Sequence, residues 1–127
     1  MLARLMIAIV LFFNLQAAVL FMVRPAAYMG GFGLSGLIGE QMVRGMGLLF
    51  LMWNIPYIFA LADPACNRTS LIEAVIMQAI GLAGESAFLL FGGPYPDPIP
   101  ATLTRFIIFD GGGLVLLLAA FALSKRP

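Results

Sequence analysis

The sequence predicts an all-α membrane protein whose four helices cross the bilayer as one bundle, and three observations lead to this. Hydrophobic residues make up 62% of the chain and charged residues only 10%, whereas soluble domains carry roughly 25% charged residues. The apolar residues fall in runs of about 20, the length that spans a bilayer. A chain of 127 residues has room for four such spans. We therefore expect a single transmembrane domain over residues 1–127.

The first two predicted spans are bounded or bent by proline. The first covers about residues 3–23 and ends before Pro25, because proline disfavours a helix at the residue that precedes it. The glycine-rich residues 26–41 follow, and we interpret them as a flexible connection. A re-entrant segment and the start of a longer second helix are the alternatives. The second span covers about residues 42–61, and Pro56 is expected to kink it.

The last two predicted spans flank a proline-rich loop. The third span covers about residues 70–91 and the fourth about residues 102–123. Residues 92–100 contain four prolines, which remove backbone donors and exclude a regular helix interior. We expect these residues to form a rigid external loop.

The distribution of basic residues predicts the orientation, because loops rich in Lys and Arg stay in the cytoplasm. Four spans place both termini and the 62–69 loop on one side, which then holds Arg4, Arg68, Lys125 and Arg126. The 92–101 loop has no basic residue. We expect both termini to be cytoplasmic in a multi-pass protein of the bacterial inner membrane.

Four charged side chains are expected at similar depth in the outer half of the membrane: Arg44, Glu85, Arg105 and Asp110. A charge at membrane depth costs about 2.5–3.5 kcal/mol on insertion scales, so it needs a partner, water or a function. Two acids and two bases can neutralise one another, and we interpret the four as a structural ion-pair network. The alternative is a transport site in which Glu85 and Asp110 bind a proton, a cation or a small polar ligand.

Three uncharged polar residues, Asn14, Asn54 and Gln78, are expected near the middle of the membrane. Gln78 lies seven residues before Glu85, so both occupy one helix face. Tyr57 is expected nearer an interface, where tyrosine rings are enriched.

Asp110 is followed by Gly111, Gly112 and Gly113 inside the fourth span. Each glycine weakens a helix by about 1 kcal/mol relative to alanine, so we expect a helix break here. Transporters use broken helices beside an acid to coordinate ions, which makes this string the best candidate for a transport site. The interpretation we favour is that the glycines let a neighbouring helix, a lipid or a pigment lie against the backbone.

The composition limits the chemistry that the chain can perform. There is no histidine, and Cys66 is the single cysteine. This excludes histidine-ligated haem or chlorophyll, histidine metal sites and histidine proton relays within the chain. A nucleophile–base pair is also hard to build, so we expect no enzyme activity and no metal. Whether a lipid, quinone or pigment binds is left open, and the net charge of +1 gives no indication of nucleic acid.

Two short patterns resemble small four-helix membrane proteins of the DoxX-like group. They are Arg44-Gly45-x-Gly47-Leu48 at the start of the second span and Arg105…Asp110-Gly111 in the fourth. The resemblance covers most of the chain in topology. It implies a four-helix bundle related to accessory subunits of quinone-linked respiratory complexes, with no catalytic residue to carry over.

Two hypotheses about function follow. The first is a non-catalytic accessory subunit that packs against other integral membrane subunits of an energy-transducing complex, for respiratory or photosynthetic electron transfer. It depends on the missing redox ligands and on plentiful small-residue helix surface. The second is a small homo-oligomeric transporter or channel for an ion or small solute, using Glu85 and Asp110. An intramembrane enzyme is the weakest alternative, since these two acids would have to supply all of its acid–base chemistry.

Overall fold

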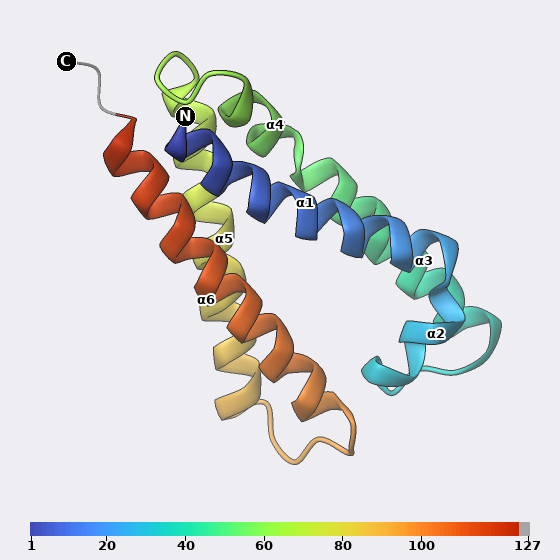
Figure 1. The fold of residues 1–127 in the computed structure, drawn as a ribbon. Helices are drawn as coiled ribbons and strands as arrows, with labels where there is room; N and C mark the ends of the chain where they lie inside the picture. Colours follow the sequence, from blue (N-terminus) through green and yellow to red (C-terminus); the bar gives the residue numbers. More distant parts are fainter. Residues whose placement is uncertain (125–127) are drawn as a thin grey trace.

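The computed structural model describes residues 1–124, and these residues form helices, turns and irregular connections without a strand. The helices run in the order α1 (Leu2–Val23), α2 (Pro25–Met29), the 3₁₀ helix η1 (Gly30–Phe32), α3 (Gly36–Trp53), α4 (Ile55–Ala62), α5 (Arg68–Phe91) and α6 (Ile99–Leu123) (Figure 1). With α3 and α4 taken together, four helical segments of the described chain are long and apolar enough to cross a membrane. The predicted all-α fold with four candidate spans is confirmed. Lys125 and Arg126 lie outside the described residues.

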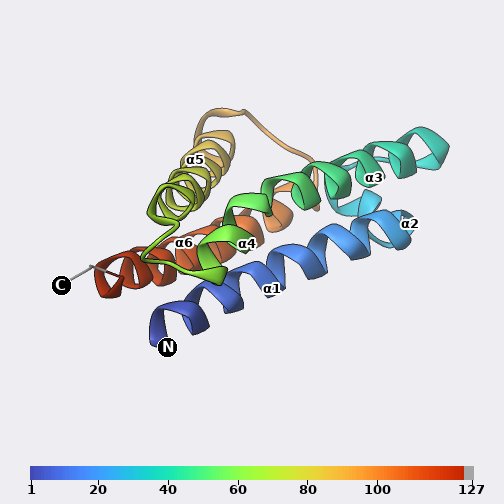
Figure 2. The same ribbon diagram turned by 90° about the horizontal axis from the view of Figure 1, so that it is seen from above.

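The helices form two pairs that converge at one end and diverge at the other (Figure 1). In one pair α1 packs along α3, and in the other α5 packs along α6. Contacts of α1 with α6 and of α4 with α5 join the two pairs. The converging end holds the N-terminus, α4 and the end of α6, whereas the diverging end holds α2, η1 and the loop between α5 and α6. Figure 2 shows the same arrangement from above.

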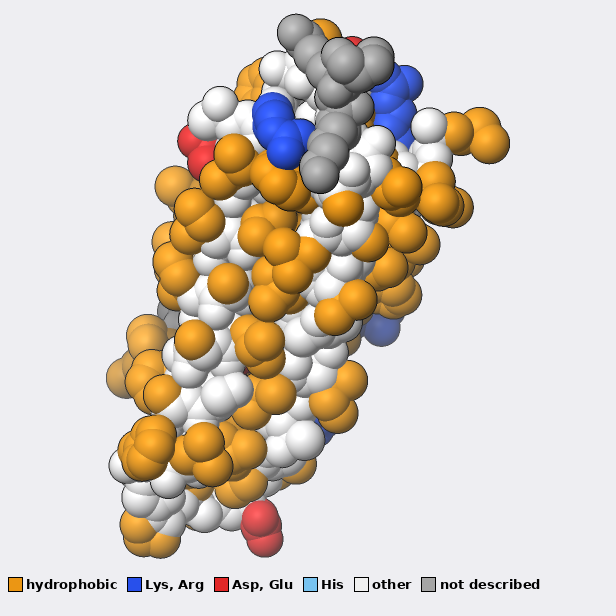
Figure 3. All heavy atoms as spheres, turned by 90° about the vertical axis from the view of Figure 1, so that its left-hand side faces the viewer, with side chains coloured by type: hydrophobic (Ala, Val, Ile, Leu, Met, Phe, Trp, Pro, Cys, Tyr) orange, Lys and Arg blue, Asp and Glu red, His pale blue; other side chains and the backbone are white. Residues whose placement is uncertain are grey.

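The apolar core lies at the converging end. Its fully buried members come from α1, α4, α5 and α6, and they are Ile7, Ala60, Leu71, Ala74, Leu117 and Ala120. Alanines let membrane helices approach closely, and the larger side chains fill the remaining space at close-packed density. On the face seen in Figure 3, hydrophobic side chains cover most of the length of the helices. This outward surface is suited to lipid.

The second span starts earlier than predicted. α3 begins at Gly36 rather than at Met42, so the last part of the 26–41 segment belongs to the long second helix, one of the alternatives considered above. The first part forms the short α2–η1 turn, which ends at Gly33 with φ of 68°. A positive φ is the left-handed conformation that glycine adopts readily. The flexible connection that we expected is therefore a compact helical turn.

The kink expected at Pro56 takes the form of an interruption at Asn54, the residue between α3 and α4. Pro56 lies in the first turn of α4, where its missing N–H is tolerated but cannot extend the hydrogen bonds of α3. The Asn54 side chain compensates in part, because its Nδ2 donates to the Phe50 carbonyl oxygen at 2.6 Å.

α6 is continuous through Gly111, Gly112 and Gly113. This corrects the expectation of a helix break at these glycines. In an apolar environment the backbone groups of a span have no partner besides the helix itself, so the helix persists despite the weak propensity of glycine. The interruption beside the polar residues lies in the second span instead.

Candidate functional site

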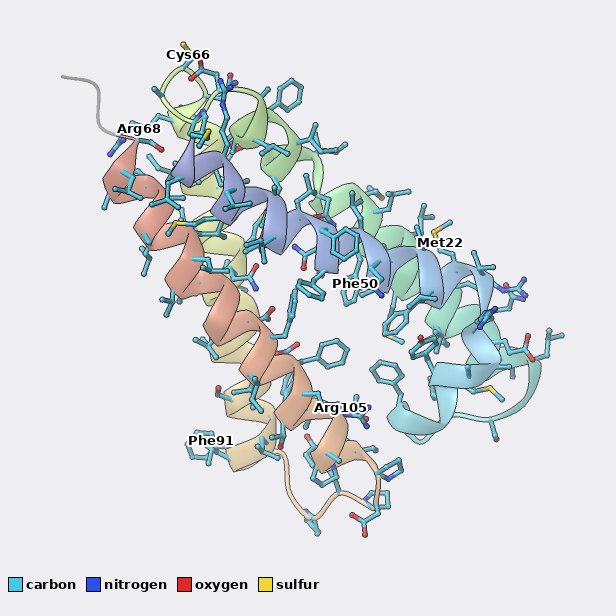
Figure 4. The ribbon with its side chains drawn as sticks, in the orientation of Figure 1. Met22, Phe50, Cys66, Arg68, Phe91 and Arg105 are labelled. Carbon is cyan, nitrogen blue, oxygen red and sulfur yellow. The ribbon has the colours of Figure 1, made fainter. Side chains whose placement is uncertain are left out.

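A cleft of about 620 Å³ lies between the two helix pairs, and every helix of the described chain contributes to its wall. Figure 4 shows this region, with Phe50 of α3 and Arg105 of α6 labelled. Aromatic side chains dominate the lining: Phe13, Phe21, Tyr28, Phe32, Phe50, Trp53, Tyr57, Phe106 and Phe109. The cleft is therefore a largely apolar chamber, with the small number of polar groups typical of binding sites for small molecules.

The polar side chains of the cleft form a chain of contacts that joins all four spans. The Tyr57 hydroxyl donates to Gln78 Oε1 at 2.8 Å, and Gln78 Nε2 donates to Asp110 Oδ1 at 2.8 Å. Asn14 lies beside the Tyr57 hydroxyl, and the carboxyl groups of Glu85 and Asp110 lie beside each other. Tyr57 and Gln78 are only 3% and 4% exposed. The structure thus brings Asn14, Gln78, Glu85 and Asp110 together.

Two buried acceptor atoms of the cleft have no hydrogen-bond partner among residues 1–124: Asn54 Oδ1 and Glu85 Oε2. Asn54 is 2% exposed, so water around the protein does not reach it freely. Buried polar atoms are normally paired, and leaving one unsatisfied costs about 1–3 kcal/mol. Both residues line the cleft, so a hydrogen-bond donor that reached these oxygens from the cleft would satisfy them.

Two glycines provide the space for the polar side chains at the α5–α6 contact. Gln78 on α5 lies over Gly113 on α6, where an added Cβ would be 2.6 Å from Gln78 Nε2. Asp110 on α6 lies over Gly81 on α5, where an added Cβ would overlap the carboxylate. The arrangement is reciprocal. On α5, Gln78 is followed three positions later by Gly81, which faces Asp110. On α6, Asp110 is followed three positions later by Gly113, which faces Gln78. Close packing against a neighbouring helix, the interpretation favoured for the glycine string, applies to Gly113.

The four charges predicted to form one network are divided in the structure. Arg105 lines the same cleft as Glu85 and Asp110, but its Nε donates to the Ala101 carbonyl oxygen of its own helix at 3.4 Å. Arg44 lies on the exposed side of α3 and pairs with Glu40 at 3.9 Å. No ion pair joins an arginine to Glu85 or Asp110 within the described part of the chain. This corrects the ion-pair interpretation, since the acids contact each other instead.

Tyr57 is the residue of the site that sequence reasoning missed, because it was expected near an interface. Its spacing from Asn54 was an available signal, since residues three apart share a helix face. The same spacing relates Phe50 to Trp53 and Phe106 to Phe109, which all line the cleft. Aromatic residues three positions apart, beside a polar residue, could thus be seen in the sequence. They did not identify the site, because apolar spans contain many aromatic residues at this spacing.

Fold and site together define the class of protein. It is an all-α chain with four helical segments able to cross a membrane, and the cleft between its two helix pairs is lined by both aromatic and polar side chains. Comparison with protein-family models, curated protein sequences and solved structures finds no match to this chain.

Proposed function

We propose that this chain is a multi-pass membrane protein that binds a small solute in the cleft and carries it across the membrane. The observation that carries the proposal is the contact between Glu85 and Asp110 on the wall of a cleft of about 620 Å³. Acids within membrane spans are costly, and they commonly mark ion, proton and substrate pathways. The pair is not neutralised by an arginine among residues 1–124, so it is available to a solute.

The shape of the bundle supports transport as well as binding. The residues that line the cleft come from the diverging parts of the helix pairs, whereas the core around Leu71 and Leu117 fills the converging end. A central polar site that is reached from one side and closed from the other corresponds to one of the two states of alternating access. The interruption at Asn54 lies beside the site and provides a point at which α3 and α4 can change their angle.

The acid pair also supports coupling of the solute to protons. Contact between two carboxyl groups is favourable when a proton on one of them forms a hydrogen bond to the other. A bound cation or donor group can replace that proton. Hydrogen bonds link Asp110 through Gln78 to Tyr57, so such an exchange would be transmitted to the second span.

The same proposal includes the location of the chain. We place it in the bacterial inner membrane with both termini cytoplasmic, because Lys125 and Arg126 add to Arg4 and Arg68 on that side. In support, Arg4 lies 4.0 Å from Asp63, and Arg68 stacks over the Phe121 ring, both at the converging end. The cleft would then open toward the outer side. A C-terminal reporter that is active only in the cytoplasm tests the orientation.

Flux measurements in proteoliposomes test the transport proposal. A panel of small amines, alcohols and carboxylates is added outside, and solute uptake and internal pH are followed. E85Q and D110N should abolish uptake of the transported solute. E40Q is the matched control, because Glu40 pairs with Arg44 away from the cleft. Uptake that is unchanged in both cleft variants, or absent for every member of the panel, would overturn the proposal.

A second proposal, consistent with a DoxX-like relationship, is a non-catalytic accessory subunit of an energy-transducing membrane complex. It is supported by α5, because only 11% of the residues in its most apolar stretch are buried within the chain. Ala83 and Ala87 are exposed on α5 and would let another membrane helix approach closely. Purification from native membranes in mild detergent tests it. Stoichiometric recovery with redox or pigment-binding subunits favours this role, and recovery alone or as a homo-oligomer favours the transporter.

A further inference from the structure

The lining of the cleft narrows the chemical class of its solute. We propose that the cleft takes an amphipathic organic cation that carries N–H donors, such as a protonated amine on an aromatic or aliphatic body. This inference rests on the proposed function, because it assumes that the cleft is a solute site.

Among residues 1–124, the buried side-chain atoms of the cleft that lack a hydrogen-bond partner are both acceptors. Asn54 Oδ1 and Glu85 Oε2 are buried and have no partner among the described residues. The neighbouring donors already have partners: Asn54 Nδ2 bonds the Phe50 carbonyl, Gln78 Nε2 bonds Asp110, and the Tyr57 hydroxyl bonds Gln78. A ligand that completes this site must bring hydrogen-bond donors. An ether or ketone oxygen would leave both acceptors unsatisfied.

The charges of the cleft favour a cation over an anion. Glu85 and Asp110 contact each other, whereas Arg105 is exposed and bonds the backbone of its own helix. Arg105 precedes Asp110 by five residues, which is about 7.5 Å along the helix axis. An ammonium group placed beside the acids would therefore meet carboxylate oxygens. A carboxylate in the same place would face two acids.

The aromatic lining suits both the body and the charge of such a ligand. Phe32 stacks on Phe106 with ring centroids 6.0 Å apart, and Phe50 lies 6.4 Å from Phe106 and 5.6 Å from Trp53. These rings form a continuous apolar wall beside the acids. Their faces also attract cations, because the negative face of the ring interacts with positive charge. The volume of about 620 Å³ accommodates a drug-sized molecule.

Other occupants of the cleft satisfy fewer of these groups. A neutral quinone or a lipid chain would fill the aromatic part but would leave the acceptors of Asn54 and Glu85 without donors. A fatty acid would bring its negative charge to Glu85 and Asp110. These occupants are the alternative outcomes of the following experiment.

Trp53 provides a specific readout, because it is the single tryptophan of the chain and lines the cleft. The full chain in detergent is titrated with 4-phenylbutylammonium, 4-phenylbutanol and 4-phenylbutyrate, which share one body and differ in the head group. Saturable change of Trp53 fluorescence is expected for the ammonium, with a Kd at least about tenfold below that of the other two, equivalent to about 1.4 kcal/mol. W53F should remove the signal.

Variants then locate the head group. E85Q and D110N should each raise the Kd of the ammonium at least about tenfold and leave the Kd of the alcohol nearly unchanged. E40Q should bind like the natural chain, because Glu40 does not line the cleft. Circular dichroism and size exclusion check that each variant is folded. If both cleft variants unfold, the comparison of head groups in the natural chain decides alone.

Two results would overturn the inference, and they differ in what they say about the proposed function. Binding of the alcohol or the carboxylate as tightly as the ammonium would exclude an organic cation as the preferred class, while transport through the cleft would stand. No saturable Trp53 response to any of the three probes would count against the cleft as a solute site and therefore against both proposals.

Discussion

The two ends of the bundle are built from the same spans but are packed differently. At the converging end the residues between helices are small, as at Ala60, Ala74 and Ala120, and the helices close around Leu71 and Leu117. At the diverging end many of the residues between helices are large aromatic ones, and a cleft of about 620 Å³ remains. Both ends are apolar, so hydrophobicity does not separate them. The size of the side chains between the helices decides whether the pairs close or stand apart.

At the diverging end, separate contacts hold the two helix pairs together. Thr102 Oγ1 on α6 donates to the carbonyl oxygen of Gly31 in η1 at 2.6 Å, and Phe32 stacks on Phe106 beside it. These contacts connect the α2–η1 turn to the opposite helix pair. Among residues 1–124, the converging end is thus held by a packed core and the diverging end by one side-chain hydrogen bond between the helix pairs and a few ring contacts. Changes at the two ends should therefore differ in size.

The largest effect is expected in the core of the converging end. Leu117→Ala should lower the free energy of unfolding by about 2–5 kcal/mol, because it leaves a cavity where the side chain is fully buried. Leu118→Ala is the matched control, since Leu118 is 49% exposed and should change stability by no more than about 0.5 kcal/mol. Unfolding in SDS followed by circular dichroism measures both. Equal losses in the two variants would contradict the assignment of this end as the packed core.

The next effect concerns the contact between polar residues and glycines. Gly113→Ala places a Cβ against Gln78 and should destabilise the protein by about 1–3 kcal/mol, as overpacking does. Gly112→Ala meets nothing within 4 Å and should be neutral or stabilise by up to about 1 kcal/mol through helix propensity. The same unfolding assay compares the two. If Gly113→Ala were as well tolerated as Gly112→Ala, the absence of a side chain at Gly113 would not be required for the packing of Gln78.

A smaller effect on stability is expected at the mouth of the cleft. Thr102→Val removes the hydrogen bond to Gly31 and should cost about 0.6 kcal/mol, the average for polar contacts between membrane helices. Acrylamide should quench Trp53 more strongly in this variant, because the α2–η1 turn is no longer attached to α6. In Thr104→Val, the control, the lost bond is to Pro100 within α6. Quenching that rises equally in both variants would show that Thr102 does not restrain the mouth.

The smallest effect is a pH dependence at the exposed loop after α4. The Cys66 backbone N–H, 2.9 Å from Asp63 Oδ1, is the main cause that lowers the pKa of Asp63, and the Ala65 N–H and Arg4 add to it. Since the folded pKa lies below the unfolded value of about 3.9, the stabilisation is complete above that value and is lost as the pH falls through the folded pKa. Unfolding midpoints of the natural chain and Asp63→Asn should converge as the pH is lowered from 6 to about 3. An unchanged difference would contradict this.

Much of the secondary structure could be predicted from the sequence, because hydrophobic run length and proline position act locally. Three of the four helical spans begin and end within a few residues of the predicted bounds. The second span departs from its predicted start because the helix begins at Gly36, and the packing of Gly39 in its first turn outweighs the low helix propensity of glycine. Gly39 is buried, and a Cβ there would contact Leu34. Likewise, α6 passes through three glycines that propensity alone would break.

From the sequence, the candidate site could be predicted only as a set of polar residues inside apolar spans, where polar groups are energetically costly. Asn14, Asn54, Gln78, Glu85 and Asp110 were identified because polar groups in apolar spans are costly wherever they point. Which of them would meet depended on the rotation of each helix about its axis. The contact of Glu85 with Asp110 depends on that rotation, and so does the position of Arg44 on the exposed side of α3, away from the cleft.

The sequence by itself determined that the chain is helical, that it has four candidate spans, and that several polar groups lie within them. Only the tertiary structure decided that Tyr57 joins Asn14 to Gln78, that Gly81 and Gly113 accept the polar side chains of the facing helix, and that the helix pairs diverge around a cleft. The physical reason is that lipid and protein interiors are similarly apolar, so hydropathy does not say which face of a span meets another helix. Side-chain size and hydrogen bonding between spans supply that information, and they act only once the helices are packed.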